Sequence, residues 1–145
     1  MLVDPQIITL SPPRLLIAGM GDALATWFEA NTCVDVPIKN TRGGLSTPSA
    51  LALAKLCNDT LFADGADALR AIQTQIVTPA LERIVEANTL LFGIGFQLSR
   101  LAAAHAIHNG LTTVKGTHDY LHGEKFLLVC WRNWYSKANP VQPSK

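Results

Sequence analysis

Apolar residues recur at helical spacing along most of the chain, and a hydroxyl residue directly followed by proline precedes several of these stretches. Proline suits the first turn of a helix, and a hydroxyl group before it can accept a hydrogen bond from a free backbone N–H. Such starts occur at Ser11-Pro12, Thr47-Pro48 and Thr78-Pro79. The pattern predicts helices over residues 14–30, 48–61, 66–76 and 80–91, an alanine-rich helix that ends at residues 109–110, and a last helix over residues 120–129.

The segments between these helices carry residues that favour turns. Gly65 is expected to end one helix, and residues 35–47 and 112–117 are predicted to be loops. Residues 2–10 are predicted to form a short extended piece, and no other stretch alternates in the manner of a β-strand. The chain is therefore predicted to be all-α, as one domain without an internal repeat.

Composition supports a packed domain and narrows the classes of partner. The 145 residues are 48% apolar and 16% charged, with a formal net charge of +1, so neither disorder nor nucleic-acid binding is expected. The N-terminus lacks the features of a signal peptide, and Asp22 interrupts the best apolar stretch, so no membrane span is expected. Three widely spaced cysteines form neither a disulfide framework nor a metal-binding pair. We expect a cytoplasmic protein with reduced thiols.

The histidines are concentrated in one segment of the chain. They are His105, His108, His118 and His122. Neutral imidazole is the commonest metal ligand in proteins, and residues three apart on a helix share one face. A carboxylate such as Asp22 would complete a site that keeps one position open for water or substrate. The cluster makes a metal site the first hypothesis.

Spacing alone leaves several alternatives open. Asp119 could supply the carboxylate, and the histidines could instead act as helix caps, dipole partners or ordinary loop residues. Asp22 could also be a dipole partner, although an unpaired buried carboxylate is costly and favours a partner for it. Gly93 and Gly95 do not form a dinucleotide fingerprint, because no GxGxxG sequence follows a strand and opens a helix.

Five stretches carry a resemblance to a known family. They are RLLIAGMGDALATWFEA, GGLSTPSALALAKLCNDTL, LERIVEANTLLFGIGF, LAAAHAIHNGLT and HGEK. Together they resemble the NAD-dependent glycerol dehydrogenases of the iron-containing (group III) alcohol dehydrogenase family, continuously from about residue 3 to residue 125. The resemblance implies the helical, metal-binding C-terminal domain of the dehydroquinate synthase-like fold.

The resemblance also implies a metal site and a reaction. In the family the metal is held by the aspartate of GMGD, the first histidine of HAIHNG and the histidine of HGEK, which are Asp22, His105 and His122 in this sequence. One Zn²⁺ per chain would act as a Lewis acid while glycerol, or a related small polyol, is oxidised to dihydroxyacetone with NAD. By the same comparison His108 and His118 are not ligands, although His108 could support one.

Two departures from the family pattern bear on activity. The family's dinucleotide-binding domain has no counterpart in this sequence, and residues 126–145 do not resemble the family. We expect residues 1–125 to be a partial metal-binding helical domain. We expect residues 126–145 to be a tail produced by a frameshift. One choice of synonymous codons for this segment, when read in a shifted frame, encodes a sequence that resembles the family. The alternative function is a non-catalytic helical remnant that binds metal or partners only, with exposed apolar faces that favour homo-oligomers.

Overall fold

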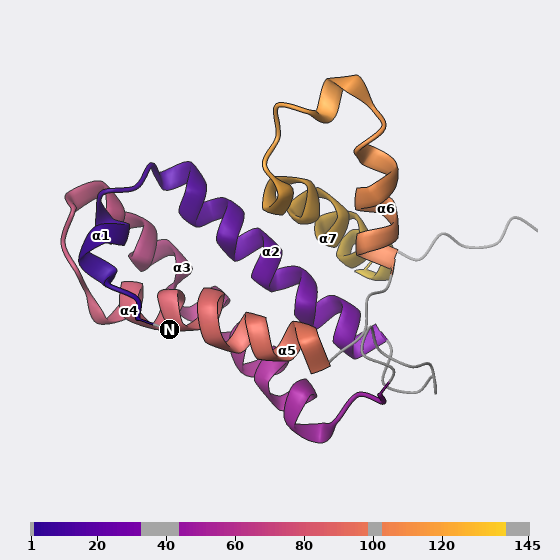
Figure 1. Ribbon diagram of the computed structural model, residues 1–145, viewed down its shortest axis with the longest axis horizontal. Coiled ribbons are helices and arrows are strands. Elements are labelled where there is room, and N and C mark those ends of the chain that lie inside the picture. Colours follow the sequence, from indigo (N-terminus) through magenta and orange to yellow (C-terminus); the bar gives the residue numbers. More distant parts are fainter. Residues whose placement is uncertain (1, 33–43, 99–102, 139–145) are drawn as a thin grey trace, which may run out of the picture.

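The computed structural model describes residues 2–32, 44–98 and 103–138, without the side chains of residues 32, 96–98, 103–106 and 132–138. Within these ranges every regular element is helical, which confirms the predicted all-α class (Figure 1). The elements are α1 (Pro5–Thr9), α2 (Pro13–Thr32), α3 (Pro48–Thr74), α4 (Pro79–Glu86), the π-helical turn η1 (Ala87–Leu91), α5 (Phe92–Leu98), α6 (Ala103–Leu111), the 3₁₀ turn η2 (Lys115–Thr117) and α7 (His122–Ala138).

Helices α3 and α4 begin at the predicted threonine and proline pairs. The Thr47 hydroxyl accepts a hydrogen bond from the N–H of Ala50 at 3.1 Å, at the start of α3. The Thr78 hydroxyl accepts one from the N–H of Leu81 at 3.3 Å, at the start of α4. Each hydroxyl satisfies a backbone donor that a helix start leaves free.

The first residues form a helix, so the predicted extended piece over residues 2–10 is wrong. The Asp4 carboxylate accepts a hydrogen bond from the N–H of Gln6 at 2.9 Å, and Pro5 occupies the first helical position. This is the same start that the threonine and proline pairs make. The β-branched residues that follow it favour a strand when they are considered alone.

Helix α3 continues through Gly65 to Thr74, so the predicted break is also wrong. A glycine inside a helix costs about 1 kcal/mol relative to alanine. Gly65 is buried, and a Cβ atom at this position would lie 3.3 Å from the sulfur of Met20 in α2. The helix ends instead at Gln75, whose φ of 55° is left-handed. Packing against α2 explains why the helix persists.

Helix α2 runs between two groups of helices (Figure 1). On one side it packs against α3 and the η1–α5 segment, and the main hydrophobic core lies among these elements and α4. The fully buried centre of that core comprises Cys57, Ala68, Leu81, Ile84 and Ala87. On the other side α2 packs against α7, where Ala25, Phe126, Val129 and Cys130 form a second, smaller core.

Helix α7 is longer than predicted and crosses the boundary expected at residues 125 and 126. It begins at His122, continues past the predicted end at residue 129 and reaches Ala138. Phe126 is completely buried, and Val129 and Cys130 are buried with it against α2. The first residues of the expected tail therefore contribute to the helical packing.

Two cysteines are buried as free thiols. Burial raises the pKa of Cys57 to about 11. Burial, together with the nearby carboxylate of Glu29, raises the pKa of Cys130 to about 12. A thiolate is the reactive form, so both thiols are expected to be unreactive in the folded protein. Cys33 lies outside the described residues.

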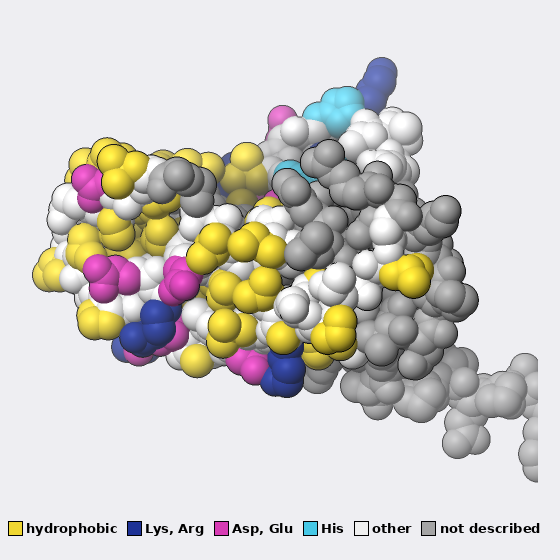
Figure 2. Space-filling view, turned by 60° about the horizontal axis from the view of Figure 1, so that its bottom comes forward, with side chains coloured by type: hydrophobic (Ala, Val, Ile, Leu, Met, Phe, Trp, Pro, Cys, Tyr) yellow, Lys and Arg dark blue, Asp and Glu magenta, His cyan; other side chains and the backbone are white. Residues whose placement is uncertain are grey.

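Large apolar side chains remain on the surface. Figure 2 shows hydrophobic patches on one face, separated by a few acidic and basic side chains. Strongly exposed examples are Ile7, Leu10, Leu56 and Phe62. Among the described helices, none combines the length and the apolar character needed to cross a bilayer. Association between copies of the chain stays a prediction.

Candidate metal centre

Asp22 and His122, which are distant in the sequence, lie next to each other. Asp22 is in the middle of α2, and His122 is the first residue of α7. The Oδ1 atom of Asp22 lies 3.4 Å from Nε2 of His122. The side chains are 28% and 49% exposed, respectively, so solutes can reach both groups from solvent. The fold brings together two of the three predicted ligands.

Close approach of two helix backbones makes this pairing possible. A Cβ atom on Gly123 would overlap the backbone carbonyl of Ala18 in α2. A Cβ atom on Gly21 would overlap the carbonyl of Gly123 and would lie 2.5 Å from the side chain of Leu127. Only glycine lets α2 and α7 come this close. Asp22 and His122 are the residues directly beside these two glycines, so the contact sets their separation.

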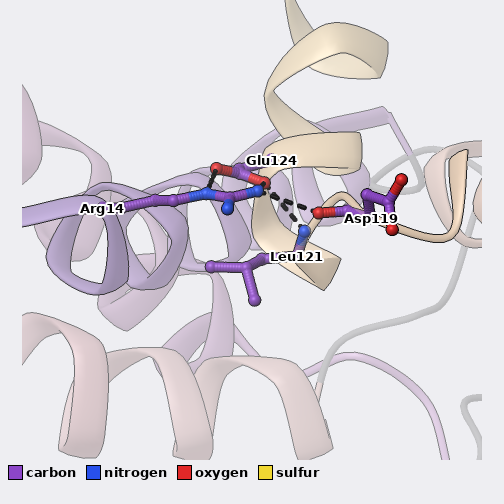
Figure 3. Close-up of polar contacts among 4 residues, drawn as sticks. All are labelled: Arg14, Asp119, Leu121 and Glu124. Atoms are coloured by element: carbon purple, nitrogen blue, oxygen red, sulfur yellow. Dashed lines mark hydrogen bonds and ion pairs between the residues drawn. The ribbon is translucent and has the colours of Figure 1, made fainter. Parts of the chain in front are cut away.

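A charged network fixes the start of α7 against α2 (Figure 3). The guanidinium of Arg14 donates from Nε to Oε1 of Glu124 at 2.5 Å and from Nη2 to Oε2 at 2.8 Å. It also donates to the backbone carbonyl of Asp119 at 3.0 Å, while Oε2 of Glu124 accepts from the N–H of Leu121 at 2.8 Å. A two-pronged arginine and carboxylate pair has a well-defined geometry. The network therefore orients the helix that begins with His122.

The same contacts keep Glu124 ionised. Arg14, and then the N–H of Leu121, lower the pKa of Glu124 to about 2. Glu124 occupies the third position of α7 and reaches back to the N–H before the helix, which is one half of a capping box. Neither Arg14 nor Glu124 was predicted from the sequence to belong to the site. The glutamate at a capping-box position was the available signal, but nothing local identified its arginine partner.

His108 lies against His122 on the side away from Asp22. Its Nε2 atom is 3.0 Å from Nδ1 of His122, and the two rings meet edge to face with centroids 4.2 Å apart. The His108 ring also stacks on Phe126, at a centroid distance of 5.2 Å and an interplanar angle of 18°. His108 is buried, with 8% of its surface exposed. The second nitrogen of His122 is thus held by a buried ring.

The two remaining histidines of the cluster, His105 and His118, lie in α6 and in the loop after it. His105 belongs to α6, and its side chain lies outside the described residues. His118 is exposed, and its Nε2 atom lies 3.0 Å from the carbonyl of Thr112 in the same loop. Among the described side chains, which do not include His105, no group of three metal-binding residues occurs. The structure thus places His122 beside Asp22 through one ring nitrogen and beside His108 through the other.

Known proteins are similar in sequence to this chain over most of its length. A glycerol dehydrogenase of Thermotoga maritima is 58% identical over 127 residues, which are 88% of this chain and 35% of that protein. No protein-family profile matches the chain. The chain spans about a third of the length of the curated relatives that it matches.

Solved structures agree with the sequence comparison. A probable glycerol dehydrogenase from Sinorhizobium meliloti matches with a TM-score of 0.83 and 44% identity, over 86% of this chain and 35% of that one. A glycerol dehydrogenase from Schizosaccharomyces pombe matches with a TM-score of 0.83 and 39% identity, over 90% of this chain and 35% of that one. The chain is therefore a homologue of the glycerol dehydrogenases over most of its own length and about a third of theirs.

Proposed function

We propose that this chain carries the metal-binding part of a glycerol dehydrogenase site, in which Asp22, His105 and His122 hold one Zn²⁺. The observation that supports the proposal most is the contact between Asp22 and His122, on two different helices. Helices α2 and α7 approach closely through glycines to make that contact, and Arg14 and Glu124 reinforce it. The homologous glycerol dehydrogenases supply the expected class of reaction.

The two described donors fit zinc in chemistry and in separation. Zinc binds imidazole nitrogen and carboxylate oxygen at about 2.0–2.2 Å, usually with tetrahedral geometry, so two of its ligand atoms lie about 3.3–3.5 Å apart. The Oδ1 atom of Asp22 and Nε2 of His122 are 3.4 Å apart. One carboxylate and two imidazoles would leave a fourth position open. The arrangement suits a site that also takes a substrate oxygen.

The protein's own groups prepare this site for an alcohol substrate. Asp22 supplies a negative charge that offsets part of the charge of a bound cation, and His122 presents Nε2 on the same side. Both are reachable from solvent, so a small polyol such as glycerol can approach them. A Zn²⁺ ion held by these residues would supply Lewis-acid chemistry for the oxidation of an alcohol, with NAD as the expected oxidant.

We also propose that the 145-residue chain is inactive when tested by itself. Its sequence contains no dinucleotide fingerprint, and holding the hydride acceptor against the substrate supplies much of the rate of such a reaction. The chain would then bind metal as a helical remnant and turn over nothing.

Purified chain incubated with Zn²⁺, glycerol and NAD is expected to contain about one zinc per chain and to form no NADH. Zinc content measured by mass spectrometry and absorbance at the NADH band test the two parts separately. The Thermotoga maritima relative, assayed in parallel, controls for the assay. Glycerol-dependent NADH formation would overturn the inactive interpretation, and absence of zinc would overturn the metal site.

The division into residues 1–125 and a frameshifted tail over residues 126–145 is part of the same proposal. Helix α7 runs across this boundary, and Phe126, the first residue after it, is completely buried. The packing of Phe126 is compatible both with a frameshifted tail and with a tail in the original frame. The nucleotide sequence after codon 125 tests the frameshift directly. A shifted frame that continues as family-like sequence is expected, and its absence would contradict the frameshift.

A further inference from the structure

The nitrogen of His122 that points away from Asp22 contacts a second histidine. Nδ1 of His122 lies 3.0 Å from Nε2 of His108, a distance typical of a hydrogen bond between the two rings. His108 is almost completely buried and stacks on the buried ring of Phe126, so its own position is fixed by packing. His122 is half exposed, and its ring lies against the same Phe126 ring at a centroid distance of 4.7 Å. The buried ring of His108 therefore holds the more exposed ring of His122.

We propose that His108 is a positioning residue that keeps the proton of His122 on Nδ1 and leaves Nε2 free to bind the metal. An imidazole that binds through one nitrogen carries its proton on the other, and the acceptor of that proton sets the orientation of the ring. His108 can accept through Nε2 because its own proton can reside on Nδ1. This inference rests on the proposed metal site, because it assigns a role only to the support of His122.

Two replacements of His108 separate hydrogen bonding from packing. His108→Phe preserves a flat ring that can stack on Phe126 but removes the acceptor. His108→Gln removes the ring but provides a side-chain oxygen that can accept from Nδ1 of His122. If His108 acted through packing alone, the phenylalanine variant would keep more of the zinc affinity than the glutamine variant. If His108 acts as a hydrogen-bond acceptor, the glutamine variant keeps more of the zinc affinity. The two roles therefore predict opposite orders of zinc affinity for the two variants.

Zinc affinity measured by competition with a chromophoric chelator is expected to fall about 10- to 100-fold in His108→Phe, the range for loss of a group that supports a metal ligand. In His108→Gln it is expected to fall less. The absorption spectrum of the Co²⁺-substituted protein should change in the phenylalanine variant, since the orientation of a ligand would change.

Nuclear magnetic resonance of the metal-free wild-type protein gives an independent readout. A scalar coupling between Nδ1 of His122 and Nε2 of His108 is expected, because such couplings are transmitted through an N–H···N hydrogen bond. Absence of the coupling, or an affinity in His108→Phe equal to that of the wild type, would overturn this inference alone. Failure of the wild-type chain to bind zinc would overturn the proposed function and this inference with it.

Discussion

Replacing Asp22 by asparagine is expected to lower the affinity of the chain for Zn²⁺ by more than about a hundredfold. Loss of a group that merely supports a ligand costs about 10- to 100-fold, and loss of the ligand charge itself should cost more. Asparagine has nearly the same shape as aspartate, so the helix around position 22 is preserved. Titration of the apo variant with Zn²⁺ in the presence of a chromophoric chelator measures the change.

Stability of the metal-free variant shows whether this loss belongs to the site. The side chains of Asp22 and His122 are 28% and 49% exposed, and even a fully charged pair at such a surface contributes only about 0–1 kcal/mol. The free energy of unfolding of apo Asp22→Asn should therefore stay within that range of the wild type. Unchanged zinc affinity would refute the ligand role, and a large loss of apo stability would mean that Asp22 supports the fold.

Gly123→Ala is expected to destabilise the fold by about 1–3 kcal/mol, the usual cost of forcing a methyl group into a filled space. The added Cβ atom would overlap the backbone carbonyl of Ala18, which is part of a helix and cannot rotate away as a side chain could. Helices α2 and α7 would have to separate, and the distance between Asp22 and His122 would increase. Urea unfolding and zinc titration of the same variant measure both effects.

Gly93→Ala is the matched control for this substitution. Gly93 is also helical, but a Cβ atom at this position would meet no atom of the described residues within 4 Å. The control is expected to gain up to about 1 kcal/mol from the better helix propensity of alanine. Equal stability of the Gly93 and Gly123 variants would mean that the close approach of α2 and α7 does not constrain the fold.

Local sequence signals predicted a helix start correctly where a single signal was present. They failed where two signals competed, or where a contact from another helix decided the outcome. Thr47 and Thr78 began helices as predicted, because no neighbouring pattern opposed the cap. Asp4 made the same kind of start, but the β-branched residues after it favoured a strand. Gly65 was predicted to break a helix, and the contact with Met20 that keeps it helical comes from another element.

The candidate site shows a similar division. The histidine cluster marked the region, and the family resemblance selected Asp22 from a part of the chain that spacing could not connect with His122. The nearness of these two residues depends on a crossing of α2 and α7. Arg14 and Glu124 could not be paired in advance, because a long-range ion pair has no period or spacing in the sequence.

The central claim is that one Zn²⁺ is held by Asp22 and His122 together with His105, whose side chain lies outside the described residues. Zinc content per chain, measured in the wild type, in His105→Ala and in the matched control His118→Ala, tests this claim most directly. We predict about one zinc in the wild type and in the His118 variant, and almost none in the His105 variant. Full zinc content in His105→Ala would contradict the proposed site.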